Sequence, residues 1–194
     1  MSTRRNFLAA LGSGAFAVAF RGAAQPLRNR VCWISPTPAA DGSPFVDEFR
    51  HGLRDLGYVE GRDVSIEVYW GENSDERIAK LVAEVVASIP HVIVAQGRTA
   101  PPVGRATSTI PVVFGFSGDV VEAGLVESLS RPGRNLTGIS FFVLELVGKR
   151  FDLLKQVLPG AKRVAVVANP QHPGDQTERR ASEVAARTLG LSLE

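Results

Sequence analysis

Six polar side chains follow three apolar segments of the chain, at the points where those segments end. Hydroxyls and amides of this kind can hold a carboxylate, and the one aspartate among them can hold an ammonium group. The set would suit a small zwitterion, such as an amino acid. Because ligands of open α/β sheets bind at the carboxyl ends of the strands, we expect these side chains to share one edge. They are Ser35, Thr37, Gln96, Thr99, Ser117 and Asp119.

Each of these residues also has a structural interpretation. Ser35 and Thr99 can be turn or cap residues, and Asp119 can cap a short helical segment that follows it. For Asp119, capping and ligand binding weigh equally and are compatible. His172, in the loop that begins at Asn169, can line a second wall of the cleft, although a solvated loop position is the preferred interpretation.

Signatures of enzymes are mostly absent from the sequence. Residues 97–102 do not form a P-loop, no G-x-G-x-x-G follows a strand, and no G-x-S-x-G turn is present. The three histidines lie in different predicted elements without the spacing of zinc ligands. We therefore predict neither a metal nor a cofactor, and we predict that the protein is not an enzyme.

Strand and helix patterns alternate from residue 30 to residue 116. Continuous apolar runs predict buried strands at 31–34, 92–95 and 112–116, and strict alternation predicts a strand at 64–70 with one exposed face. Apolar residues at helical spacing predict helices over 45–56 and 75–86, and the pair Pro101-Pro102 allows only a short helix from Val103. This order is typical of an α/β fold, a parallel sheet with helices on both faces.

A second α/β unit begins after residue 140. An extended segment from Thr137 leads to a predicted helix over 144–158, a strand from Lys162, a helix over 177–189 and the start of a strand at 191–194. One strand and one helix cannot bury a core of their own. We therefore predict an N-terminal lobe at 30–140, a crossing helix at 141–160, and an incomplete second lobe at 161–194.

Residues 1–24 have the three parts of an export signal: paired arginines, an apolar run over 8–20, and small residues before a plausible cleavage site after Ala24. Arg4-Arg5 with the following Phe7 resembles a twin-arginine signal, which exports folded proteins in bacteria. The alternative is an amphipathic helix that stays attached. We expect a periplasmic protein.

The same segment dominates the charge of the chain. The formal net charge is +2, and without Arg4, Arg5 and Arg21 it falls to about −1. The charge therefore gives no support for nucleic-acid binding, and no nucleic-acid partner is expected. The single cysteine, Cys32, cannot form an internal disulfide and is interpreted as a buried thiol.

Five sequence blocks resemble the periplasmic substrate-binding proteins of ABC transporters, in the branch that includes tryptophan- and tyrosine-binding members. The resemblance covers almost everything from Arg30 to Glu194, and the combination of blocks is highly specific. The blocks are 49–61 (FRHGLRDLGYVEG), 110–119 (IPVVFGFSGD), 124–138 (GLVESLSRPGRNLTG), 149–154 (KRFDLL) and 164–170 (VAVVANP).

The resemblance implies two α/β lobes that close on a small ligand by hinge motion. It places Ser35, the loop Gly97, Arg98 and Thr99, Asp119, and Asn169 of the second lobe where the family lines its cleft. Three positions depart from the family pattern. Arg98 interrupts the usual Gly-Thr, Val120 replaces a proline, and Arg134 replaces a glycine.

The leading hypothesis is a monomeric binding protein that delivers an amino acid or similar ligand to an ABC permease and its ATPase. Members of the family are much longer, so the chain is expected to be an N-terminal portion that binds tightly only when the second lobe is complete. The alternatives are an exported enzyme that uses Asp119 as acid or base, and an interaction module that no longer binds a ligand. Asp119→Asn would abolish turnover in the first alternative and only weaken binding in the leading hypothesis.

Overall fold

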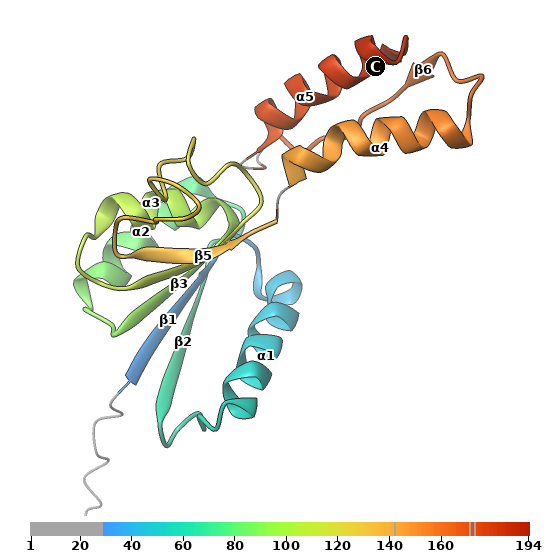
Figure 1. Cartoon of the computed structure of the whole chain (residues 1–194). Helices are drawn as coiled ribbons and strands as arrows, with labels where there is room; N and C mark the ends of the chain where they lie inside the picture. The colour runs from blue at the N-terminus through green and yellow to red at the C-terminus, as the bar shows by residue number, and fades with distance from the viewer. Residues whose placement is uncertain (1–28, 142, 171, 173) are drawn as a thin grey trace, which may run out of the picture.

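The computed structural model describes residues 29–141, 143–170, 172 and 174–194. The export signal predicted over residues 1–24 lies outside the described residues. Figure 1 shows two lobes, an N-terminal lobe of residues 29–140 and a second lobe of residues 143–194. The chain passes from one to the other between the last strand of the sheet and a long helix.

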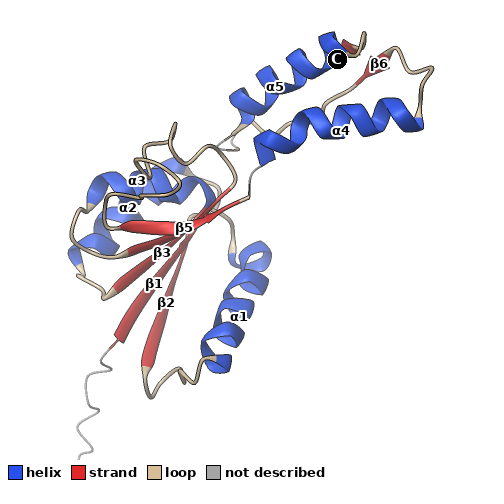
Figure 2. Cartoon of the chain, in the orientation of Figure 1, coloured by secondary structure: helices blue, strands red, loops and turns tan. Residues whose placement is uncertain are grey.

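The N-terminal lobe is built on a parallel sheet with the strand order β2-β1-β3-β4-β5. The strands are β1 (Asn29–Ser35), β2 (Val64–Trp70), β3 (Val92–Gln96), β4 (Val112–Phe116) and β5 (Leu136–Ser140). The helices of this lobe are α1 (Ala39–Asp55), α2 (Asp75–Ala87) and α3 (Ala100–Ala106). Figure 2 shows them on both faces of the sheet, which confirms the predicted α/β class.

Two hydrophobic cores lie on the two faces of the sheet, because successive residues of a strand point to opposite faces. Val31 and Trp33 of β1 pack with Val46 of α1. Cys32 and Ile34, the alternate residues, pack in the core that contains α2 and α3. Both faces of β1 are therefore buried, and this is why the strand is a continuous apolar run.

Helix α1 begins earlier than the sequence predicted. We expected the helix to begin at Phe45, but it starts at Ala39 and contains Pro44. The first turn packs closely on the end of β2, since a Cβ added to Gly42 would overlap the ring of Trp70. The Ser43 hydroxyl also donates a hydrogen bond to the Ala39 carbonyl at 2.6 Å. Tertiary packing therefore stabilises a helical turn that the local composition disfavours.

Helix α3 also begins earlier than predicted. It starts at Ala100, directly after the short 3-10 helix η1 (Gly97–Thr99), and not at Val103. Pro101 and Pro102 occupy its first turn. Backbone N–H groups have no partner inside the helix there, so proline costs little at these positions. The prediction that this helix is short is confirmed.

The second lobe contains two helices and a small parallel sheet. The elements are α4 (Val143–Val157), β6 (Arg163–Val164), α5 (Asp175–Thr188) and β7 (Ser192–Leu193). Val147 and Phe151 of α4 pack with Ala186 of α5 in a third core. We expected a longer strand from Lys162. The strand β6 has only two residues, because its partner β7 is equally short.

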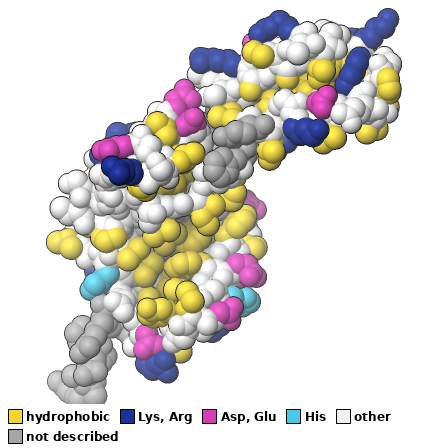
Figure 3. Space-filling view, viewed as in Figure 1, with side chains coloured by type: hydrophobic (Ala, Val, Ile, Leu, Met, Phe, Trp, Pro, Cys, Tyr) yellow, Lys and Arg dark blue, Asp and Glu magenta, His cyan; other side chains and the backbone are white. Residues whose placement is uncertain are grey.

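One face of the sheet is only partly covered among the described residues. Helix α1 packs over β1 and β2, whereas Val113 of β4 and Ile139 of β5 are 40% and 66% exposed on the same face. Figure 3 shows hydrophobic side chains gathered on this side of the N-terminal lobe. The apolar residues of β4 and β5 therefore do not all belong to the core.

The sheet can be tested where strands β4 and β5 approach each other closely. Gly138 of β5 lies opposite Phe114 of β4, and a Cβ at Gly138 would overlap the Phe114 carbonyl oxygen. We expect Gly138→Ala to lower the free energy of unfolding by about 1–3 kcal/mol, as overpacking of a fixed backbone does. Urea unfolding measures the change.

The control for this substitution is Gly115→Ala. Gly115 lies on the neighbouring strand β4, and an added Cβ there meets no atom within 4 Å. Its unfolding curve should stay close to that of the parent chain. Equal destabilisation by both substitutions would contradict the steric explanation.

A polar cluster crosses from β1 to β2 on the face covered by α2. Arg30 donates two hydrogen bonds to the Glu67 carboxylate, from Nε at 2.9 Å and from Nη2 at 3.2 Å. Tyr69 donates its hydroxyl to the same carboxylate at 3.0 Å. The bonds from Arg30 lower the pKa of Glu67, and burial raises the pKa of the neighbouring Cys32 to about 11.

The raised pKa of Cys32 predicts a loss of stability at alkaline pH. The folded thiol keeps its proton to about pH 11, whereas the ordinary value is 9.0, so the folded state binds more protons between these values. Stability is therefore fully present below pH 9 and falls as the pH rises towards 11. Urea unfolding at pH 8 and pH 10.5 should show a larger loss for the parent than for Cys32→Ala. A parallel loss in both proteins would contradict this prediction.

Candidate functional site

The carboxyl ends of three neighbouring strands form one edge of the N-terminal lobe. Ser35 is the last residue of β1, η1 follows β3, and Ser117 follows β4. Since β1, β3 and β4 are adjacent in the sheet, the predicted site residues of this lobe share that edge. Their binding of a ligand stays a prediction.

Ser35 and Thr99 are fully buried, and their hydroxyls are used inside the protein. Ser35 Oγ lies 3.0 Å from Thr37 Oγ1 and accepts a hydrogen bond from the Thr37 N–H at 3.3 Å. Thr99 Oγ1 lies within hydrogen-bonding distance of the Ile34 carbonyl, at 3.1 Å, and of the Gln96 carbonyl, at 2.9 Å. Both residues therefore fix the backbone under the edge, as the turn and cap interpretation proposes.

Gly97 and Arg98 turn the chain out of β3. Gly97 has φ of +54°, a conformation that glycine adopts without steric cost. Arg98 Nη1 lies 3.0 Å from Oδ1 of Asp75, at the start of α2, and the Arg98 side chain is only 14% exposed. The charge that departs from the family pattern is therefore paired with a carboxylate of the same lobe.

Asp119 caps the turn that follows β4. Its Oδ1 accepts hydrogen bonds from the backbone N–H groups of Val121, at 2.8 Å, and Glu122, at 2.9 Å. Residues 120–124 form a turn and not the short helix that we expected. Asp119 itself is exposed, so capping leaves its negative charge at the edge of the lobe.

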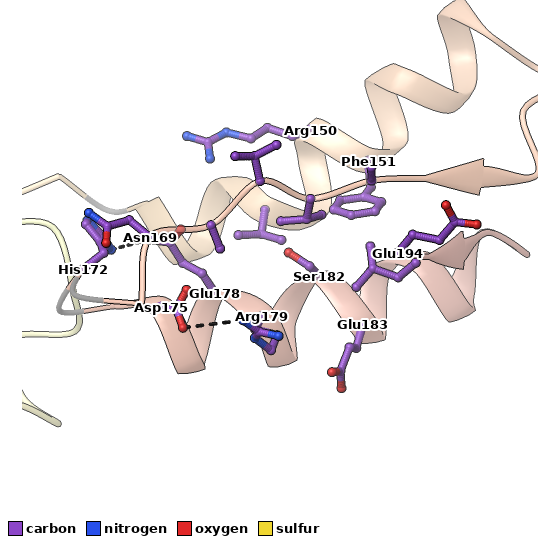
Figure 4. A pocket seen from close by; sticks show the side chains of 16 residues that line it. Arg150, Phe151, Asn169, His172, Asp175, Glu178, Arg179, Ser182, Glu183 and Glu194 are labelled. Carbon is purple, nitrogen blue, oxygen red and sulfur yellow. Dashed lines mark ion pairs between the residues drawn. The ribbon is translucent and has the colours of Figure 1, made fainter.

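The second lobe presents Asn169 and His172 at the end of the segment that follows β6. Asn169 is exposed, and its carbonyl accepts the His172 N–H at 2.8 Å. Both residues line a cavity of about 710 Å³ between α4 and α5, which Figure 4 shows from close by. Its charged lining residues are Arg150, Asp175, Glu178, Arg179, Glu183 and Glu194.

Two acidic residues of this wall were missed by the sequence reasoning. Asp175 and Glu178 lie in the first turn of α5, where the positive end of the helix dipole favours carboxylates. Asp175 Oδ1 and Glu178 Oε1 are buried and lack a hydrogen-bond donor among the described residues. The acidic first turn after the loop 169–174 was the signal that could have identified them.

His172 reaches from the second lobe to the N-terminal lobe. Its Nε2 lies 2.7 Å from Ser117 Oγ. On the other side of the ring, Nδ1 accepts the Gly174 N–H at 3.3 Å and lies 3.6 Å from Glu178 Oε1. In the neutral ring that accepts from Gly174, Nε2 carries the proton, and in the charged ring both nitrogens do. In the tautomer with the proton on Nδ1, which faces Glu178, Nε2 instead accepts the Ser117 hydroxyl, so the direction of the Ser117–His172 hydrogen bond depends on the tautomer.

The described residues contain neither a metal-binding cluster nor a membrane-spanning helix. No group of three or more histidine, cysteine, aspartate or glutamate side chains there is arranged to hold a metal ion. Among the helices of the same residues, none combines the length and apolar character needed to span a membrane.

Comparisons with known proteins extend this picture. Residues 40–194 match the sequence model of a family described as ABC transporter substrate binding protein. A tyrosine-binding protein from Clostridioides difficile (strain R20291) is 30% identical over 131 residues, which are 65% of this chain and 37% of that protein.

Two solved structures share the fold. A conserved domain protein from Vibrio cholerae has a TM-score of 0.75 at 26% identity, over 85% of this chain and 55% of that one. A domain from Streptococcus pneumonia in complex with L-Trp has a TM-score of 0.74 at 21% identity, over 86% of this chain and 56% of that one. The chain thus spans little more than half the length of these two relatives. With the family match extending over residues 40–194, the chain belongs to the ABC transporter substrate binding protein family.

Proposed function

We propose that this chain captures a small ligand between its two lobes for an ABC transporter, and that the ligand is an amino acid or a similar molecule. One observation carries the proposal. The loop 117–119, at the edge of the sheet, contacts the second lobe through the Ser117 hydroxyl and the His172 ring. A crevice between two α/β units is where such folds bind ligands. The tyrosine-binding and L-Trp-bound relatives support an amino acid.

The chemistry of the two edges is consistent with a zwitterion. Asp119 offers an exposed carboxylate for an ammonium group, and the loop Gly97 to Thr99 offers backbone N–H groups for a carboxylate. Asn169 and His172 supply polar groups from the opposite wall. The protein then binds its ligand without converting it, acts in the periplasm as a monomer, and passes the ligand to a membrane permease and its ATPase.

Nuclear magnetic resonance titration tests this proposal, because it detects weak as well as tight binding. We expect an L-amino acid, with tyrosine, tryptophan and leucine as the first choices, to shift the amide signals of residues 97–99, 117–119, 169 and 172 in a saturable way. The matched control is the same titration with a nucleotide, which should leave these signals unchanged. If no amino acid shifts these three loops, the proposed function is wrong.

A further inference from the structure

The turn that follows β1 lies between the segments that follow its two neighbouring strands. Strands β2 and β3 flank β1, so the chain leaving each of them passes beside the turn 35–37 (Figure 1). On one side, Asn73 donates its N–H to the Pro36 carbonyl at 2.8 Å. On the other side, a Cβ added to Gly97 of η1 would lie 3.8 Å from Pro36 Cγ. The turn is therefore in contact with both segments.

An ion pair joins these two segments across the end of β1. Arg98 Nη1 in η1 lies 3.0 Å from Asp75 Oδ1 at the start of α2. Because η1 follows β3 and α2 follows β2, the pair links the two neighbours of β1 to each other. We call residues 35–37, 71–75 and 97–99 the β1 clamp.

The segment 71–75 has a backbone that needs support from its surroundings. Glu72 and Asn73 both have a positive φ, 51° and 55°. Residues other than glycine rarely adopt this conformation, and they keep it only where neighbouring contacts impose it. Two such contacts are the hydrogen bond from Asn73 to the turn 35–37 and the ion pair at Asp75. The conformation of this segment therefore depends on the β1 clamp.

The burial of Arg98 argues against a role in global stability. Its side chain is 14% exposed, and Nη2 is buried without a hydrogen-bond partner among the described residues. A buried donor of a charged group that lacks a partner lowers the free energy of unfolding. The partner Asp75 is 85% exposed, and pairs with such exposure contribute little to stability. The guanidinium is therefore better explained by the loops that it holds together.

We propose that Arg98 is a positioning residue, which fixes the two ligand loops 35–37 and 97–99 relative to each other through Asp75. This inference rests on the proposed function, because these loops belong to the ligand edge of the N-terminal lobe. Nη1 is paired with Asp75 and Nη2 is buried, so Arg98 acts on the ligand through the loops and not by contact. Loops that are already ordered lose less freedom when a ligand binds, and binding is tighter.

Amide hydrogen exchange without any ligand tests the β1 clamp. In Arg98→Gln, the amides of Thr37 and Asn73 should exchange about three to five times faster, because the loss of one ion pair eases local opening by that factor. The urea unfolding curve should stay unchanged or move to higher urea, since the unpaired Nη2 is removed. A role in global stability alone would instead lower the unfolding midpoint. Arg98→Lys keeps the charge and should restore part of the protection.

Matched controls remove single charges from exposed positions of the same lobe. Arg105→Gln on α3 and Glu76→Gln on α2 should leave the exchange of both amides unchanged. Asp75→Asn should reproduce the effect of Arg98→Gln. The double variant should add little to either substitution, because each of them already removes the same ion pair.

The binding of an amino acid gives a second measurement. Arg98→Gln should weaken it about three to five times in the nuclear magnetic resonance titration, and Arg105→Gln should not change it. Unchanged exchange in both Arg98→Gln and Asp75→Asn would overturn the inference, and so would faster exchange with equal affinity. If the parent chain binds no amino acid, the proposed function is wrong, and the exchange rates still decide whether Arg98 holds the two loops.

Discussion

Asp119→Asn should weaken the binding of an amino acid about tenfold or more, because a charge-assisted hydrogen bond to an ammonium group is lost. Asparagine caps turns and helices about as well as aspartate does, so the two bonds from Val121 and Glu122 to Oδ1 can be kept. The substitution therefore separates the two roles of Asp119. The same titration that tests the proposed function measures the change.

Two further variants separate the loss of the Asp119 charge from the loss of its cap and from a general loss of negative charge. Asp119→Ala removes the cap as well as the charge and should also lower the free energy of unfolding by about 1 kcal/mol, whereas Asp119→Asn should leave it unchanged. Asp152→Asn, at a half-buried carboxylate of α4 that pairs with Lys149, is the control for a general loss of negative charge. Equal affinity of the parent and Asp119→Asn would show that the carboxylate is only a cap.

The sheet could be predicted from the sequence because each strand has a local signal. The run 31–34 is apolar on both faces and lies in the middle of the sheet, whereas β2 alternates and lies at its edge. Helix α2 begins at Asp75, where the prediction placed it, and Ser74 Oγ caps it by accepting the Arg77 N–H at 3.3 Å. Period and capping are properties of neighbouring residues, so one sequence is enough to identify them.

The starts of α1 and α3 could not be predicted in the same way. The turn at Gly42 is stabilised by Trp70, a residue 28 positions later, and this contact outweighs the low helix propensity of the segment. In α3, proline was treated as a helix breaker, although its cost depends on its position in the helix. Both errors come from applying a local rule where packing or position decides.

The candidate site was predicted in part. Its place at the ends of β1, β3 and β4 followed from the parallel order of the strands. The roles of single residues did not follow, because a buried hydroxyl such as that of Thr99 serves a backbone carbonyl as readily as a ligand. The contact between Ser117 and His172 has no signal in the sequence, since it depends on how the two lobes meet.

The support beneath the loop 117–119 leads to the prediction with the largest expected effect on stability. Phe116, the last residue of β4, is 2% exposed. Its ring lies directly under the loop, since a Cβ added to Gly118 would be 2.8 Å from Phe116 Cε1. We expect Phe116→Ala to lower the free energy of unfolding by about 3–5 kcal/mol, because it removes a large buried side chain and leaves a cavity.

The matched control is Phe45→Ala on α1, where the ring is 58% exposed and its removal should cost about 0.5 kcal/mol or less. Urea unfolding measures both variants. The cavity of Phe116→Ala would lie below Ser117 and Asp119, so hydrogen exchange of the amides at 117–122 should also become faster than in Phe45→Ala. A loss of stability with unchanged hydrogen exchange in that loop would mean that the Phe116 ring stabilises only the sheet and not the loop. Faster exchange would mean that the core of the N-terminal lobe also holds in place the loop that faces the second lobe.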